Sequence, residues 1–76
     1  MSEPEEISID VRGLMPPEPL ERVLDALSTM QKGQKLRMLI DREPLPLYRI
    51  LQNNGYAWST RNLPDYLFEI LIWEKN

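Results

Sequence analysis

The sequence contains no cysteine and no histidine, and both absences restrict its chemistry. Without cysteine the chain has no disulfide, thiolate nucleophile, persulfide carrier or thiolate metal ligand. Without histidine it lacks the usual general base near neutral pH and the commonest metal ligand. Most familiar catalytic arrangements are thereby excluded. We therefore predict a protein that is not an enzyme and that holds no metal or cofactor.

Positive charge and long apolar runs are also scarce. Nine Lys and Arg residues against twelve Asp and Glu residues give a net charge of −3. This balance argues against nucleic acids and anionic membranes as partners, because both need a positive field. The apolar run at residues 70–73 is far shorter than the roughly 20 residues that span a bilayer. The acidic start at residues 1–6 does not resemble a signal peptide, so we expect a cytoplasmic location.

What is present suits one small globular domain. Hydrophobic residues make up 42% and charged residues 28% of the 76 positions, a globular rather than a disordered balance. Residues 1–5 contain nothing to bury and are predicted to form a flexible tail. The domain is therefore expected to comprise residues 6–75.

Hydrophobic periodicity predicts four strands and two helices. Alternating apolar and polar residues predict strands at residues 7–12 and 35–41, and aromatic and β-branched residues predict a third at 56–61. Turn residues at 62–65 precede a last strand at 66–73. Apolar residues recur at helical spacing between Pro16 and Gly33 and between Pro44 and Asn53, which predicts a helix in each segment. The two apolar stripes are Leu20, Val23, Leu24, Leu27 and Met30, and Leu47, Ile50 and Leu51.

The order β-α-β-α-β-β predicts the fold class. A helix that crosses between two strands makes them parallel, with a right-handed connection. Both helices should therefore cover one face of a four-stranded mixed sheet. The last strand is apolar on both faces, which indicates a central position. One face carries Phe68, Ile70 and Ile72, and the other carries Leu67, Leu71 and Trp73. The sequence thus predicts an α/β (α+β) two-layer sandwich.

The loops after the first two strands are expected to lie at one edge, where both helices begin. They contain Arg12 and Gly13, and Asp41, Arg42 and Glu43. Free N–H groups of two helix starts, together with two guanidinium groups, suit an anion. The alternative is structural, in which the two arginines pair with nearby carboxylates. Those carboxylates are Asp10, Glu18, Asp41 and Glu43.

Asp41 and Glu43 also admit a catalytic or a cation-binding interpretation. Acid–base work by two carboxyl groups needs one of them held protonated by burial, whereas Pro44 suggests an exposed turn. An oxygen-only cation site needs several acidic ligands in a defined loop, and that spacing is absent from the sequence. We therefore interpret both as solvated turn carboxylates.

The aromatic residues have two interpretations. Tyr56 and Trp58 suit either a stacking platform or the core, and the core is favoured in so short a chain. By alternation, four apolar side chains point away from the helices and indicate an interaction face, unless the sheet twist and the tail cover them. These four are Leu39, Leu67, Leu71 and Trp73.

Several motifs resemble known families. The run from Asp10 to Leu14 reads D-V-R-G-L and is followed by P-E-P at residues 17–19. It resembles the opening of the TusA/SirA sulfur-carrier family, D-x-R-G-L and then C-P-x-P, whose fold is the same β-α-β-α-β-β sandwich. An uncharacterised bacterial family, domain of unknown function twenty-two forty-nine, is more similar still. It shares D-R-E-P, here residues 41–44, and G-Y-x-W, here residues 55–58.

The resemblance breaks at the reactive position of the carriers. Pro16 stands where they have their cysteine, and proline cannot hold a persulfide. The resemblance therefore implies the scaffold and the location of a binding edge, but no covalent sulfur transfer. That edge runs from Arg12 to Glu18, through Met15, Pro16 and Pro17.

We predict a non-catalytic binding module that holds a partner protein or a small anion at this edge. The alternative implied by the resemblance is an accessory protein of sulfur or redox metabolism that acts without a covalent persulfide. Exposed apolar atoms at Met15, Pro16 and Pro17 would favour a protein partner. A concave pocket with Arg12 and Arg42 pointing inward would favour a small anion.

Overall fold

The computed structural model describes residues 6–75, and the tail predicted at residues 1–5 lies outside the described residues. No helix of the described part is long and apolar enough to cross a membrane. The order of elements is the predicted one. The elements are β1 (Glu6–Asp10), α1 (Glu18–Thr29), β2 (Lys35–Ile40), α2 (Leu45–Asn53), β3 (Tyr56–Leu63), the 3-10 turn η1 (Pro64–Tyr66) and β4 (Leu67–Glu74).

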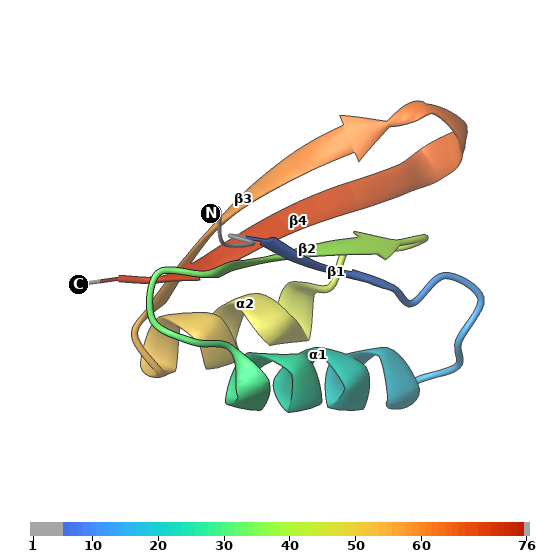
Figure 1. Cartoon of the computed structure of the whole chain (residues 1–76). Coiled ribbons are helices and arrows are strands. Elements are labelled where there is room, and N and C mark those ends of the chain that lie inside the picture. Colours follow the sequence, from blue (N-terminus) through green and yellow to red (C-terminus); the bar gives the residue numbers. More distant parts are fainter. Residues whose placement is uncertain (1–5, 76) are drawn as a thin grey trace.

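The four strands form one mixed sheet in the order β1-β2-β4-β3. Strands β1 and β2 are parallel, and β4 runs antiparallel to both of its neighbours. Figure 1 shows α1 and α2 together on one face of this sheet, which leaves the other face without a helical layer. The predicted two-layer sandwich and the central position of the last strand are both confirmed.

The core lies between the two helices and the sheet face that they cover. Alternate residues of β2 and β4 point into it, because side chains of a strand alternate between the two faces of a sheet. Leu24 departs from the predicted stripe of α1, since its side chain is 39% exposed. The buried residues are Val11, Val23, Leu27, Leu36, Met38, Ile40, Leu47, Leu51, Ile70 and Ile72.

The hairpin between β3 and β4 turns later than predicted. Asp65 and Tyr66 have φ angles of 66° and 61°, which are left-handed rather than extended. Tyr66 therefore belongs to the turn and not to the last strand, where the prediction put it, because an extended ladder needs negative φ. Strand β3 continues to Leu63, which pairs with Leu67 across the turn.

Replacing Leu51 by alanine tests the core. Its side chain is fully buried on α2, so Leu51→Ala is expected to lower the free energy of unfolding by about 2–5 kcal/mol, through lost burial and the cavity left behind. Leu45→Ala, on the same helix at a residue that is 63% exposed, should change it by less than about 0.5 kcal/mol. Urea denaturation of both variants measures the difference, and equal losses would contradict this assignment of the core.

Candidate functional site

The loops after β1 and β2 lie together at one edge of the sheet, as the topology predicts. The Val11 N–H donates to the Leu39 carbonyl at 2.9 Å, which continues the parallel pairing beyond the end of β1. The Gly13 N–H donates to Oδ2 of Asp41 at 3.0 Å and joins the two loops. Gly13 has a φ of 77°, which glycine adopts without strain. We call residues 12–18 and 41–44 the helix-start edge.

Arg12 is held by a neighbouring carboxylate. Its Nε donates to Oδ1 of Asp10 at 2.9 Å and its Nη2 to Oδ2 at 2.7 Å, a two-point pair. These hydrogen bonds lower the pKa of Asp10 and raise the pKa of Arg12. The structural interpretation therefore describes Arg12, because its guanidinium already has a carboxylate partner.

The carboxylates of the helix-start edge each have a separate donor. Asp41 accepts the backbone hydrogen bond that joins the loops. Glu43 accepts a hydrogen bond from the Tyr48 hydroxyl at 3.1 Å, and Glu18 pairs with Arg22 at 3.2 Å. Burial raises the pKa of Tyr48. Within residues 6–75 no group of three or more acidic side chains is placed to hold a metal ion.

Arg42 differs from Arg12. Its side chain is exposed, and no hydrogen bond or ion pair joins it to any other residue of the described chain. It also lies on the wall of an apolar cavity between the two helix starts. The positive charge of Arg42 is therefore available to a ligand or partner, whereas the charge of Arg12 is paired with Asp10.

An apolar cavity of about 340 Å³ opens between the two helix starts. Its inner wall includes the buried side chains of Val23, Met38 and Ile40, so the cavity reaches the core. Five of the seven prolines in the chain line it. The sequence predicted a binding edge here but not an apolar cavity, although prolines grouped at both helix starts are a signal of apolar surface. The lining residues are Pro16, Pro17, Pro19, Leu20, Val23, Met38, Ile40, Arg42, Glu43, Pro44, Pro46 and Leu47.

The first turns of both helices offer few N–H groups to a ligand. In α1 the Glu18 N–H donates to the Met15 carbonyl at 2.9 Å, and Pro19 has no N–H. In α2 the Leu45 N–H donates to the Glu43 carbonyl at 3.0 Å. Pro46 and Leu47 follow, the first without an N–H and the second bonded to the Pro44 carbonyl. The prolines thus replace polar donors by carbon at both helix starts.

The loop before α1 exposes apolar atoms beside the cavity. Met15 is 76% exposed, and Pro16 and Pro17 are also exposed. The peptide bond between these two prolines is cis. The exposed apolar atoms that would favour a protein partner are therefore present. The pocket with two inward arginines that would favour a small anion is not formed, because Arg42 lines the cavity and Arg12 does not.

The sheet face opposite the helices carries both apolar and charged side chains. Leu39, Leu67, Leu71 and Trp73 lie on this face and are half-buried rather than exposed. Lys35 of β2 lies opposite Trp73 of β4, and the Nζ of Lys35 is 5.6 Å from the centre of the indole ring. The four apolar residues are thus partly covered within the sheet itself.

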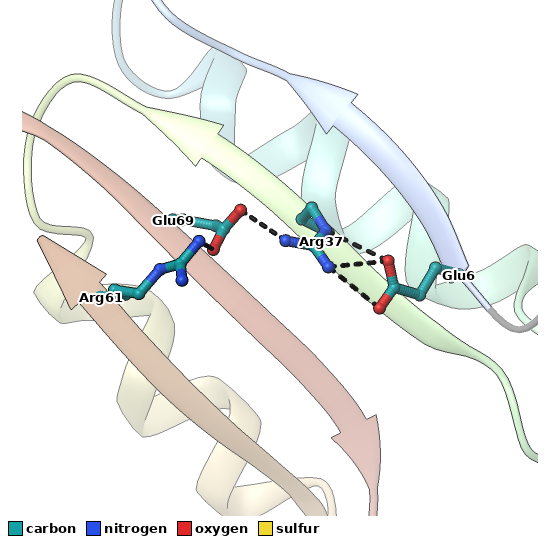
Figure 2. Close-up of polar contacts among 4 residues, drawn as sticks. All are labelled: Glu6, Arg37, Arg61 and Glu69. Atoms are coloured by element: carbon teal, nitrogen blue, oxygen red, sulfur yellow. Dashed lines mark hydrogen bonds and ion pairs between the residues drawn. The ribbon is translucent and has the colours of Figure 1, made fainter. Parts of the chain in front are cut away.

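Four charged side chains cross this open face, one from each strand (Figure 2). Arg37 on β2 contacts Glu6 on β1 at 2.9 Å and Glu69 on β4 at 2.5 Å. Glu69 also contacts Arg61 on β3 at 2.7 Å. Sequence reasoning missed this network, because it depends on the register that sets β4 between β2 and β3.

The network shifts the ionisation of its members. Glu69 is 17% exposed, and the hydrogen bond from Arg37 lowers the pKa of its carboxyl group against the opposing effect of burial. The hydrogen bonds from Arg37 to Glu69 and Glu6 raise the pKa of Arg37. Both shifts favour the charged forms, so the network is held as ion pairs at neutral pH.

Tyr56 and Trp58 pack against the core from β3 and are half-buried, as the core interpretation predicts. Trp58 stacks on Tyr48 of α2, with the ring centres 5.2 Å apart and the planes 6° from parallel. The Tyr48 hydroxyl also bonds to Oγ1 of Thr60 at 2.7 Å. These contacts fasten α2 to the sheet, so the two aromatic residues of β3 serve the packing of the domain.

Glu69→Gln tests the network through pH. A carboxyl group whose pKa is lower in the folded chain stabilises it above the unfolded pKa, and this stabilisation is lost as pH falls through the folded pKa. The wild-type free energy of unfolding should therefore decrease as the pH is lowered below the ordinary range of glutamate. Urea denaturation of Glu69→Gln should show a shallower decrease. Glu21→Gln, outside the network on α1, is the control, and equal slopes in all three proteins would contradict the assignment.

Comparison with known proteins agrees with this description. None of the curated proteins matches the chain. The crystal structure of a SirA-like protein from Desulfitobacterium hafniense superposes with a TM-score of 0.79 over 91% of this chain and 97% of that chain. The two sequences are 21% identical, so the likeness establishes a shared fold.

A family model described as an uncharacterized conserved protein (DUF2249) matches residues 8–74. This range contains the whole helix-start edge and all but the first two residues of β1. The motifs D-V-R-G-L, D-R-E-P and G-Y-A-W all lie within it. The chain therefore belongs to the DUF2249 family of uncharacterized conserved proteins, on the SirA-like fold.

Proposed function

We propose that this protein is a non-catalytic binding module, and that it holds an apolar side chain of a partner protein in the cavity at the helix-start edge. The observation that carries the proposal is the cavity itself, about 340 Å³ in volume and walled by aliphatic and proline side chains. Ligand sites are typically concave and mostly apolar, with a few polar groups that fix orientation.

Apolar occupancy is favoured over a small inorganic anion. Among the first-turn N–H groups that would bind an anion, those of Glu18, Leu45 and Leu47 are bonded to backbone carbonyls, and Pro19 and Pro46 have none. Arg12 is paired with Asp10 and does not line the cavity. A phosphate or sulfite ion in the cavity would lose its hydration to carbon atoms and gain few hydrogen bonds, which costs free energy.

Arg42 supplies the polar part of the site. It lies on the cavity wall, and within residues 6–75 its guanidinium has no carboxylate partner. A carboxylate next to an apolar group would pair with it, and arginine suits this role because its planar group donates two parallel hydrogen bonds. We therefore propose that the partner presents an apolar side chain and a carboxylate side by side.

Exposed Met15 widens the surface available to a protein. Its side chain is 76% exposed beside Pro16 and Pro17, so the apolar area continues from the cavity onto the loop. Apolar area of this kind at a surface is typical of protein contacts. The absence of histidine and cysteine supports a module without catalysis, and the acidic composition supports a protein partner rather than nucleic acid.

A set of small probes tests the site. N-acetylleucine carries an apolar side chain and a carboxylate, N-acetylleucinamide lacks the charge, and acetate lacks the side chain. In amide NMR titrations, N-acetylleucine is expected to give saturable shifts at Leu20, Met38 and Arg42. The uncharged analogue should bind about tenfold more weakly, which corresponds to about 1.4 kcal/mol for one charged hydrogen-bonded pair. Acetate and inorganic phosphate should give no saturable shifts.

Arg42→Ala is the matched variant. It should bind N-acetylleucine and N-acetylleucinamide equally, because the charge that distinguishes them is gone. Arg22→Ala, on the exposed surface of α1 outside the cavity, should retain the wild-type preference. Saturable binding of phosphate at Arg42 without binding of N-acetylleucine would replace the apolar site by a small-anion site. The absence of any saturable response would overturn the proposal.

A further inference from the structure

The two edges of the sheet differ in how well they are protected. Strand β1 has 5 residues and carries acidic side chains at both of its ends, Glu6 and Asp10. Strand β3 has 8 residues and contains neither proline nor lysine. Its register with β4 runs without a bulge from Tyr56 to Leu63. Natural proteins usually blunt a long edge strand with proline, a bulge or charged side chains. The one charged side chain of β3, Arg61, is paired with Glu69 of its own chain, so β3 is the less protected of the two edges.

One hydrogen bond fixes which backbone groups of β3 point outward. The Lys75 N–H donates to the Gly55 carbonyl at 2.8 Å, and the two residues are directly opposite in the register of β3 and β4. In an antiparallel pair, hydrogen-bonded and non-hydrogen-bonded residues alternate. The odd-numbered residues of β3 therefore bond to β4. The N–H and C=O groups of Tyr56, Trp58, Thr60 and Asn62 point away from the sheet.

These outward groups have no backbone partner among residues 6–75. Figure 1 shows β3 along the outer side of the sheet, with both helices on the face of the sheet rather than at this edge. Four donors and four acceptors are thus presented along one continuous strand. The spacing of such a row fits an extended polypeptide chain and little else.

We propose that β3 pairs with β3 of a second copy of this chain, antiparallel and about a twofold axis at Ser59. The four strands of each copy would then join in one continuous sheet. In this register Tyr56 lies opposite Asn62 of the second copy, and Trp58 lies opposite Thr60. These four residues are those with outward N–H and C=O groups, so the register bonds every one of these groups in both copies. Shifting the strands by two residues in either direction would leave some of them unbonded.

The side chains of β3 suit this self-pairing. Arg61 is its only charged residue and would lie opposite Ala57 of the second copy, while Ser59 would face Ser59. Like charges that face each other are the usual obstacle to pairing identical strands, and no like charges face each other in this register. Arg61 keeps its partner Glu69 within its own chain, so no ion pair has to be broken. This charge compatibility is the reason for choosing a second copy over a foreign strand.

The interface is independent of the proposed binding site. The cavity is lined by residues of α1, β2, α2 and the loop before each helix, and none of its lining residues belongs to β3. A dimer formed through β3 would therefore present two cavities. Such a module would bind a partner with two copies of the recognised segment more tightly than a monomer does, by effective concentration.

Ser59→Lys tests the axis. Ser59 is exposed on the open face, so a lysine there should leave the fold of the monomer intact. In the dimer this lysine would face the same lysine of the second copy, and the two like charges would repel. Sedimentation velocity of the full chain over a range of concentrations is expected to show a monomer–dimer equilibrium for the wild type. The Ser59→Lys variant should raise the dimer dissociation constant by about fivefold or more. Ser8→Lys, the same substitution on the same face at the β1 edge, should leave the equilibrium unchanged.

A mixing experiment and hydrogen exchange complete the test. An equimolar mixture of Ser59→Lys and Ser59→Glu should restore dimers, because opposite charges then face each other at the axis. In the wild type, amide exchange at Tyr56, Trp58, Thr60 and Asn62 should slow as protein concentration rises. A wild-type chain that stays monomeric at every concentration would overturn the proposal. So would a dimer in which Ser59→Lys has no effect and these four amides remain unprotected, because its interface would lie elsewhere.

Discussion

Strand β4 forms hydrogen bonds with two neighbours, and each of its faces supports a different part of the structure. On the covered face, Ile70 and Ile72 are fully buried beneath the helices. On the open face, Glu69 forms ion pairs with Arg37 of β2 and Arg61 of β3. If β4 were not between β2 and β3, the core would lose its centre and the charge network could not form. The rest of the molecule depends on this antiparallel insertion.

Prolines decide the character of the helix-start edge. A helix start with free N–H groups attracts anions, but prolines in the first turns and in the preceding loops remove donors and add apolar surface. The loops also bring their own carbonyls to the remaining N–H groups, as between Glu18 and Met15. The result is an apolar cavity with Arg42 on its wall, a cation that has no ion-pair partner among residues 6–75. The scaffold is that of the SirA-like fold, while the chemistry at this edge differs from that of a sulfur carrier.

The two proposed surfaces lie on different elements and use different forces. The cavity would recognise side chains, through apolar contact and one charged pair. The edge of β3 would recognise backbone, through the N–H and C=O groups that a sheet of four strands leaves unbonded. On the open face, opposite the helices, alternating charges join all four strands and the apolar side chains are half-buried. This internal pairing makes the open face a weaker candidate for contact than either surface beside it.

Local pattern was enough to determine the order of elements, the fold class and the central place of the last strand. Alternation and helical spacing are set by residue types a few positions apart. The absence of cysteine and histidine excludes thiolate and imidazole chemistry without reference to the structure. Only the tertiary structure decided which partner each charged group takes. Arg12 pairs with Asp10, whereas Arg42 has no ion-pair partner in the described part of the chain. The sequence left both outcomes open because ion pairs depend on the geometry of loops. The charge network and the cavity are assembled from residues far apart in the chain, so they exist only once the strand register and the helix positions are set. The late turn at Tyr66 has the same origin, since a left-handed backbone at a tyrosine is a local cost that the pairing of β3 with β4 must offset.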